Sequence, residues 1–222
     1  MIYKYYKNIE FAKQALINRQ LFFSNVSTFN DPYEKIFVFK DKDTEQVFVS
    51  HDSKISGMVC CFSKDQRSYL MWSHYANSHS GVCIGYDFST TIIKKEKDGY
   101  AKCISNGKEF VLNEVNYDVY IPSVDMKLMH SEFDETIKAF SNKMECWKYE
   151  NEIRAIRNAK DSNIIEIPRE CIKEIYYGWY YDESREMLQK LINENKIDIK
   201  EYKMSVDFAT KQMFYMDLNK TF

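Results

Sequence analysis

Residues 147–154 read Trp147-Lys148-Tyr149-Glu150-Asn151-Glu152-Ile153-Arg154. If this segment enters a β-strand, the two-residue period places Glu150, Glu152 and Arg154 on one face of the strand. Two carboxylates about 7 Å apart then share a surface with a guanidinium, which suits the orientation of a sugar hydroxyl or the stabilisation of a developing cation. An exposed edge strand with a ladder of Glu and Arg side chains explains the same pattern, and the segment alone does not separate the two interpretations.

The composition of the whole chain limits the class of protein. The chain has 222 residues, of which 45% are hydrophobic and 16% are aromatic, so it is long enough to bury a sizeable core. Its formal net charge of −2 provides no overall basic field for nucleic acid or an anionic membrane. The 6 glycines include no G-x-G spacing, which argues against a P-loop NTPase and against a Rossmann enzyme with a glycine-rich turn.

Cysteine usage and apolar patterning indicate a cytoplasmic protein. The first residues, Met-Ile-Tyr-Lys-Tyr-Tyr, contain no apolar signal region, and no stretch of about 18 apolar residues occurs, so we expect no membrane association. The 6 cysteines form no C-x-x-C pair. We therefore expect reduced, mostly buried thiols and no structural metal site.

Periodicity and turn residues predict a single α+β domain over residues 1–222. Strands are expected at 2–6, 21–23, 36–39, 46–50, 58–62, 81–88, 163–167, 172–178 and 197–204. Helices are expected at 9–19, 68–78, 126–142 and 183–195. A Lys-rich surface loop is expected at 94–108, followed by a strand pair at 109–120.

The predicted helix at 68–78 carries aromatic and polar residues that suit a planar ligand. Trp72 and Tyr75 are three residues apart and therefore share a helix face, beside Ser73 and His74. Such aromatic side chains can hold a heterocycle by stacking, and they can equally be core residues. Because His74 belongs to no H-E-x-x-H motif, we expect no catalytic metal.

Two segments near the start of the chain are further candidates. In an extended first strand, Lys4 points away from Tyr3 and Tyr5, and it could receive a phosphate or a ribose hydroxyl. An amphipathic strand with a solvated lysine is the alternative. Asn30-Asp31, which precedes a proline, is a second polar candidate that also fits a capped turn.

The order of the motifs along the chain resembles a bacterial and phage family known as a domain of unknown function. The motifs are Tyr3-Lys4-Tyr5, Phe29-Asn30-Asp31-Pro32-Tyr33-Glu34, Cys61-Phe62-Ser63, Met71-Trp72-Ser73-His74-Tyr75-Ala76, Gly81-Val82-Cys83-Ile84-Gly85-Tyr86-Asp87 and Trp147-x-Tyr149-Glu150-x-Glu152-x-Arg154. That family is similar to a branch of the ADP-ribosyltransferase-like superfamily. In particular, Arg67-Ser68-x-Leu70-Met71-Trp72 is similar to a stretch in members that modify DNA. The resemblance implies an ADP-ribosyltransferase-like split mixed β-sheet core flanked by helices.

The resemblance also implies a reaction and a set of site residues. Proteins of this superfamily split NAD between nicotinamide and ribose, and they bind it without glycine-rich loops. Glu152 is implied to bind the ribose and stabilise the cation, with Glu150 activating the acceptor or holding Arg154; Glu150 is the alternative catalytic carboxylate. The residues implied to bind NAD are Tyr3, Lys4, Tyr5, Asn30, Asp31, Ser63, Arg67, Trp72, Ser73, His74 and Tyr75.

We therefore expect a NAD-dependent ADP-ribosyltransferase, a toxin or phage-defence effector that modifies RNA, DNA or protein and is paired with a cognate antitoxin or chaperone. NAD is then a substrate, and no metal is expected. A non-enzymatic nucleic-acid-binding module is the alternative, since aromatic side chains can stack on bases while basic ones follow phosphates. A sensor domain on a degenerate enzyme fold is a third interpretation, and it predicts a filled or collapsed cleft.

Overall fold

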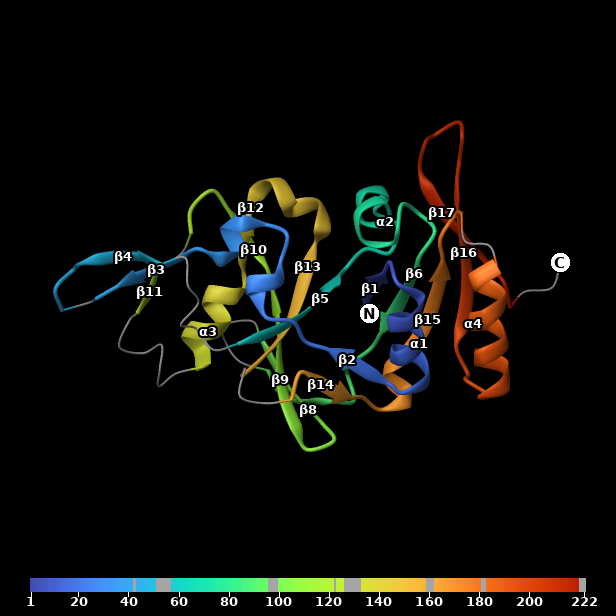
Figure 1. Ribbon diagram of the computed structural model, residues 1–222, viewed down its shortest axis with the longest axis horizontal. Coiled ribbons are helices and arrows are strands. Elements are labelled where there is room, and N and C mark those ends of the chain that lie inside the picture. Colours follow the sequence, from blue (N-terminus) through green and yellow to red (C-terminus); the bar gives the residue numbers. More distant parts are fainter. Residues whose placement is uncertain are drawn as a thin grey trace.

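A ten-stranded mixed β-sheet occupies the middle and one end of the structure (Figure 1). The structure is a computed structural model that describes residues 1–41, 43–50, 57–95, 100–121, 123–125, 133–158, 162–180 and 183–219. The strand order is β17-β16-β15-β6-β1-β5-β13-β9-β8-β7. In that order the strands are Met213–Asp217, Lys200–Val206, Ile172–Tyr177, Val82–Tyr86, Ile2–Tyr6, Met58–Ser63, Glu152–Arg157, Lys108–Glu114, Ala101–Ser105 and Ile92–Lys95. Among these strands β15 and β16 pair in parallel, and the other neighbours pair in antiparallel fashion.

Smaller sheets and short helices surround the large sheet. The small sheets join β11 (Ser123–Asp125), β3 (Phe37–Lys40) and β4 (Val47–Ser50), then β10 (Asn116–Asp118) with β12 (Asn142–Met144), and β14 (Ile164–Glu166) with β2 (Gln20–Phe22). The α-helices are α1 (Ile9–Ile17), α2 (Tyr69–Tyr75), α3 (Phe133–Phe140) and α4 (Glu183–Glu194). The 3₁₀ helices are η1 (Val26–Thr28), η2 (Pro32–Lys35), η3 (Glu145–Glu150) and η4 (Arg169–Cys171). No described helix is long and apolar enough to cross a membrane.

The sheet is weakly joined next to its first strand. β1 pairs with β6 at five positions, from Ile2 opposite Tyr86 to Tyr6 opposite Val82, but with β5 only where Tyr3 lies opposite Ser63. Because the backbones of β1 and β5 are not paired along the rest of their length, side chains of both strands can border a cavity there. The candidate site described below lies at this position.

Helices pack on the sheet where their apolar faces allow it. In α1 the side chains of Ala12, Ala15 and Leu16 are buried, as expected for residues three and four apart, and Asn8 caps the helix by accepting a hydrogen bond from the backbone N–H of Glu10. Helix α4 lies beside α1 at the end of the sheet that carries β15 and β16 (Figure 1). These helices and the strands beneath them form the largest core cluster.

The prediction of an α+β fold is confirmed, but the middle of the chain differs from expectation. The predicted loop at 94–108 contains β8 and the end of β7. Strands β8 and β9 form a hairpin whose two-residue turn, Asn106-Gly107, has positive φ at both positions (51° and 73°), the geometry that this dipeptide favours. The predicted strand pair at 109–120 consists of β9 and β10, which pair with other strands. Of the helix predicted at 126–142, α3 covers 133–140, and residues 126–132 lie outside the described residues.

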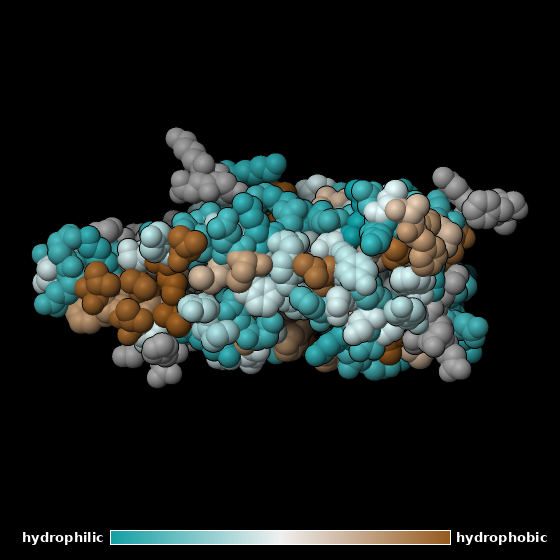
Figure 2. Space-filling view, turned by 90° about the horizontal axis from the view of Figure 1, so that it is seen from above, coloured by the Kyte–Doolittle hydropathy of each residue, from teal (hydrophilic) through white to brown (hydrophobic). Residues whose placement is uncertain are grey.

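One end of the molecule exposes apolar side chains. Val47, Phe48 and Val49 of β4 are all exposed, and Figure 2 shows a brown patch at the end formed by the three-stranded sheet. Contiguous exposed apolar groups of this kind are uncommon on soluble proteins. None of these three residues lines the pocket described below.

Gly81, just before β6, packs closely against the backbone of β1 and of the residue that follows α2, and this contact gives a test of the packing around the site. A Cβ atom added at Gly81 would lie 2.3 Å from the carbonyl oxygen of Tyr6 and 2.9 Å from backbone atoms of Ala76. Because backbone atoms cannot rotate away, Gly81→Ala is expected to lower the free energy of unfolding by about 1–3 kcal/mol. Urea unfolding measures this loss.

The matched control is Gly107→Asn, in the exposed turn between β8 and β9. No atom lies within 4 Å of the added Cβ there, and asparagine tolerates the positive φ of 73° better than other residues. We expect a loss below about 1 kcal/mol for this variant. Equal losses in the two variants would contradict the packing described for Gly81.

Candidate active site

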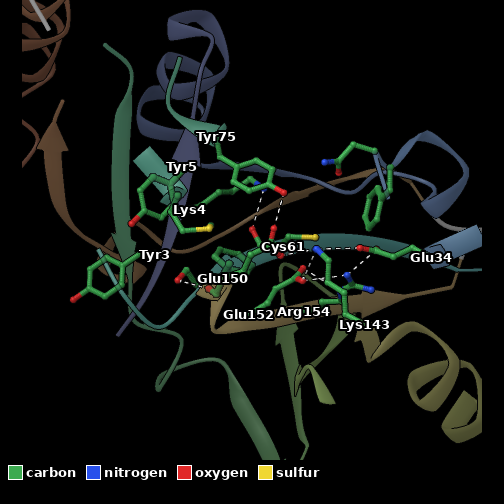
Figure 3. Close-up of a pocket in the computed structure, with 15 residues that line it drawn as sticks. Tyr3, Lys4, Tyr5, Glu34, Cys61, Tyr75, Lys143, Glu150, Glu152 and Arg154 are labelled. Atoms are coloured by element: carbon green, nitrogen blue, oxygen red, sulfur yellow. Dashed lines mark hydrogen bonds and ion pairs between the residues drawn. The ribbon is translucent and has the colours of Figure 1, made fainter. Parts of the chain in front are cut away.

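A pocket of about 170 Å³ opens between β1, β5 and β13 (Figure 3). Cavities of roughly 150 Å³ hold one benzene molecule, so this pocket has room for one ring-sized group. Fifteen side chains line it, and they combine aromatic rings with charged groups. They belong to Tyr3, Lys4, Tyr5, Phe29, Asn30, Glu34, Cys61, Phe62, Ser63, Met71, Tyr75, Lys143, Glu150, Glu152 and Arg154.

The two glutamates reach the pocket by different routes. Glu152 and Arg154 lie on one face of β13, opposite Ser63 and Cys61 of β5, as the two-residue period predicts. Glu150 is not part of that strand, because it ends η3. Asn151 between the glutamates adopts a left-handed conformation (φ 44°, ψ 53°), which turns the chain so that both carboxylates face the pocket.

Five buried charged side chains form one wall of the pocket. The ammonium nitrogen of Lys143 lies 2.5 Å from Glu150, 3.0 Å from Glu34 and 3.5 Å from Glu152. The guanidinium of Arg154 contacts Glu152 at 2.9 Å and Glu34 at 2.7 Å. Each of the five residues is at most 9% exposed. Three carboxylates and two cations give this buried ion cluster a formal charge of −1.

Hydroxyl groups complete the surroundings of Glu150. The phenol of Tyr75, on α2, donates a hydrogen bond of 2.6 Å to a carboxylate oxygen of Glu150. The hydroxyl of Ser63 donates a hydrogen bond, also of 2.6 Å, to the backbone carbonyl oxygen of Glu150. Figure 3 shows Tyr75 directed at Glu150 from the side opposite β13. Glu150 is therefore held by groups from three separate parts of the chain.

The environments of the two neighbouring glutamates move their pKa values in opposite directions. Burial by itself raises the pKa of Glu152, but the positive charges of Arg154 and Lys143 outweigh this effect and lower the pKa to about 2. For Glu150, burial dominates over the attraction of Lys143, and the pKa is raised. A pair of carboxyl groups whose pKa values are separated in this way is typical of sites that need one permanent anion and one group that exchanges a proton.

The pocket brings together most of the residues proposed from the sequence. Besides the two glutamates and the arginine, it is lined by Tyr3, Lys4, Tyr5, Asn30, Ser63 and Tyr75. Lys4 donates to the carbonyl oxygen of Cys61 at 3.2 Å, and Tyr5 donates to the carbonyl oxygen of Asp65 at 2.7 Å. These bonds fix the β1 side of the pocket.

Five proposed residues lie elsewhere: Asp31, Arg67, Trp72, Ser73 and His74 do not line the pocket. Trp72 is fully buried in the core, where its indole N–H donates to the carbonyl of Gln66. His74 is exposed and bonds to the hydroxyl of Tyr149 at 3.0 Å. Asp31 caps η2 through the N–H of Tyr33.

Two charged residues of the cluster were not proposed from the sequence. Glu34 belongs to the motif Phe29-Asn30-Asp31-Pro32-Tyr33-Glu34, and its position in this motif could have indicated that it is a site residue. Lys143 has no such signal, because it is a single lysine in a short strand, although it lies only seven residues before Glu150.

Metal-ligating side chains do not cluster among the described residues. Among them no group of three or more His, Cys, Asp or Glu side chains is arranged to hold a metal ion. The carboxylates of the cluster are occupied by Lys143 and Arg154 instead. All six cysteines are free thiols.

Comparison with known proteins identifies one similarity. Residues 71–155 match a family model described as a protein of unknown function (DUF2971). This part of the chain includes Tyr75, Lys143, Glu150, Glu152 and Arg154, and therefore most of the charged wall. No curated protein and no solved structure showed a significant match.

Removing Lys143 tests the energetic role of the buried ion cluster. Lys143→Met leaves three buried carboxylates with one cation, so we expect a loss of about 3–5 kcal/mol in the free energy of unfolding. Lys148→Met is the matched control, because Lys148 forms an exposed pair with Glu145 at 4.0 Å. That variant is expected to lose less than about 1 kcal/mol. Comparable losses in chemical denaturation would contradict a buried ion cluster.

The opposite pKa shifts predict opposite effects on acid stability. Glu152 has a folded pKa below its unfolded value of about 4.3, so its contribution is present above that pH and is lost as the pH falls toward 2. Glu152→Gln should therefore have a lower free energy of unfolding at pH 7 than the unsubstituted chain. Between pH 4 and pH 2 its free energy of unfolding should fall by less than that of the unsubstituted chain.

Glu150 supplies the control of opposite sign. Its folded pKa is raised, so its protonation stabilises the folded state as the pH falls toward its unfolded value of about 4.3. Glu150→Gln should lack this stabilisation, so its free energy of unfolding should fall more steeply between pH 7 and pH 4 than that of the unsubstituted chain. Unfolding measured at several pH values checks both variants, and identical profiles would show that the shifts are absent.

Proposed function

We propose that this chain is a NAD-dependent ADP-ribosyltransferase, which cleaves the bond between nicotinamide and ribose and transfers ADP-ribose to an acceptor. The observation that supports this proposal best is the pair Glu150 and Glu152, which have opposite pKa shifts and share one wall of a ring-sized pocket. Aromatic side chains line the same pocket, and a pyridinium ring is attracted both to aromatic faces and to a wall of net negative charge.

The proposed chemistry assigns a different task to each glutamate. As the glycosidic bond breaks, its electron pair moves to the ring nitrogen, nicotinamide leaves as a neutral molecule, and positive charge develops on the ribose. Glu152 remains ionised because of Arg154 and Lys143, so it is suited to stabilise that charge. Glu150, with its raised pKa, is suited to accept the proton that the acceptor loses when its new bond to the ribose forms.

The size of the pocket limits how NAD is held. A cavity of about 170 Å³ accommodates the nicotinamide end, while the pyrophosphate and adenosine remain outside it. The weak pairing of β1 with β5 agrees with the split sheet that the sequence resemblance implies. An open, charged pocket also differs from the filled cleft that a sensor on a degenerate fold predicts.

The biological setting of the proposal rests on the resemblance of the sequence motifs. In this setting the protein is a cytoplasmic toxin or phage-defence effector, its acceptor is RNA, DNA or protein, and an antitoxin or chaperone controls it. Aromatic residues outside the pocket, such as His74 and Tyr149, are available to contact an acceptor.

Release of nicotinamide from NAD tests the proposed function. The purified protein should release nicotinamide, and Glu152→Gln should reduce the rate by about 10²–10³-fold, the usual effect of removing one group that stabilises a transition state. Glu145→Gln changes an exposed carboxylate of η3 that does not line the pocket, so it should retain the full rate. Circular dichroism checks that each variant is folded.

A protein that neither binds NAD nor releases nicotinamide, alone or with a cell extract, would overturn the proposal. Salt-dependent binding of oligonucleotides that is unchanged in Glu152→Gln would instead identify the nucleic-acid-binding alternative.

A further inference from the structure

The positively charged groups around the pocket differ in how well they are paired. Arg154 uses its guanidinium on Glu34, Glu152 and the carbonyl oxygen of Phe140. Lys143 has three donors and three carboxylates within 3.5 Å. Within the charged wall, therefore, the donors are already occupied and have little capacity left for a ligand.

Lys4 on the opposite side of the pocket is less well paired. Its ammonium group has three donors, and its hydrogen-bond partners are the carbonyl oxygen of Cys61 at 3.2 Å and the side chain of Cys60. Among the described residues no carboxylate lies within ion-pair distance of this ammonium group. The rings of Tyr6 and Phe62 lie 5.8 Å and 5.7 Å away, and Glu152 attracts the ammonium group without pairing with it. Since a half-buried ammonium gains from a further acceptor, Lys4 is the donor that a ligand oxygen can satisfy.

The small volume of the pocket determines which oxygen this is. The sequence suggested that Lys4 receives a phosphate or a ribose hydroxyl, but a pocket of about 170 Å³ has room for one ring and its substituents. Because the proposed reaction places the ribose beside Glu152 on the charged wall, the group that meets Lys4 on the other side of the pocket is an oxygen carried by the ring itself. Figure 3 shows side chains of β1 on one side of the pocket and the charged wall with Lys143 and Arg154 on the other.

We propose that the pocket selects a positively charged ring that carries a carbonyl or carboxylate oxygen, and that Lys4 is the specificity-determining residue that binds this oxygen. The ring charge faces the buried ion cluster, whose formal charge is −1, while the substituent points toward β1. This inference rests on the proposed function for its choice of ring, a pyridinium.

Three ligands with the same ring and the same ring charge provide the test: N-methylnicotinamide, N-methylnicotinate and N-methylpyridinium. Titration calorimetry on the 222-residue chain should give dissociation constants for the first two that are at least about tenfold lower than for the third, because only they carry the oxygen. In Lys4→Met the three constants should lie within about threefold of one another. Lys4→Arg, which keeps a charged donor, should retain the preference.

The control is Lys7→Met, an exposed lysine just after β1 that does not line the pocket, and it should bind all three ligands as the unsubstituted chain does. Equal binding of the three ligands to the unsubstituted chain, no binding of any of them, or a preference that survives in Lys4→Met overturns the inference. If Lys4→Met fails to fold, the three dissociation constants of the unsubstituted chain and of Lys4→Arg still decide whether the inference holds.

The two proposals fail independently. Ligand binding requires no cleavage of NAD, so a selective pocket without nicotinamide release would overturn the proposed enzyme and leave the role of Lys4 intact. Release of nicotinamide by a pocket that does not distinguish the three ligands would overturn the role of Lys4 alone.

Discussion

The buried ion cluster is the constraint on which the site depends. Three carboxylates cannot be withdrawn from water unless cations accompany them, and here Lys143 and Arg154 are shared among all three. The participants come from η2, β12, η3 and β13, which are up to 120 residues apart in sequence. Any displacement of one element would leave a charge unpaired, so the cluster holds these elements in one arrangement. The wall of the pocket is thereby fixed before a ligand arrives.

This fixed arrangement also explains why two adjacent carboxylates can differ in their chemistry. Arg154 bonds to both oxygens of Glu152, whereas Glu150 is held by one cation and one phenol. Burial acts on both groups, and the number of positive partners decides which pKa falls and which rises. An enzyme that stabilises a developing positive charge needs such groups oriented in advance, because no reorganisation is then required during the reaction.

The sequence predicted which residues meet in the pocket better than it predicted the middle of the fold. Alternation along one strand correctly placed Glu152 beside Arg154, since it depends only on local geometry. Glu150 reaches the pocket from a 3₁₀ helix through the left-handed Asn151, a turn that the alternation does not contain. Lys143 was not predicted because the 3₁₀ helix that returns Glu150 to it over seven residues was expected as part of a strand. By contrast, Asn106-Gly107 is a strong hairpin signal within the segment predicted as a loop, so the information for β8 and β9 was present locally.

The balance of charge in the pocket bears on the two classes of function. A nucleic-acid-binding surface needs cations that follow phosphates and aromatic faces that are open to bases. Here Tyr3 and Tyr5 are only 8% and 9% exposed, and the cations of the charged wall form ion pairs with carboxylates. A phosphate brought to this wall would meet a formal charge of −1, whereas a cationic ring would be attracted to it. Lys4 lines the same pocket, so the six charged side chains of the pocket comprise three acids and three bases, and only the wall formed by the buried ion cluster has an excess of acid. A pyridinium ring is therefore favoured over a polyanion beside that wall, while an oxygen of the ligand is favoured beside Lys4.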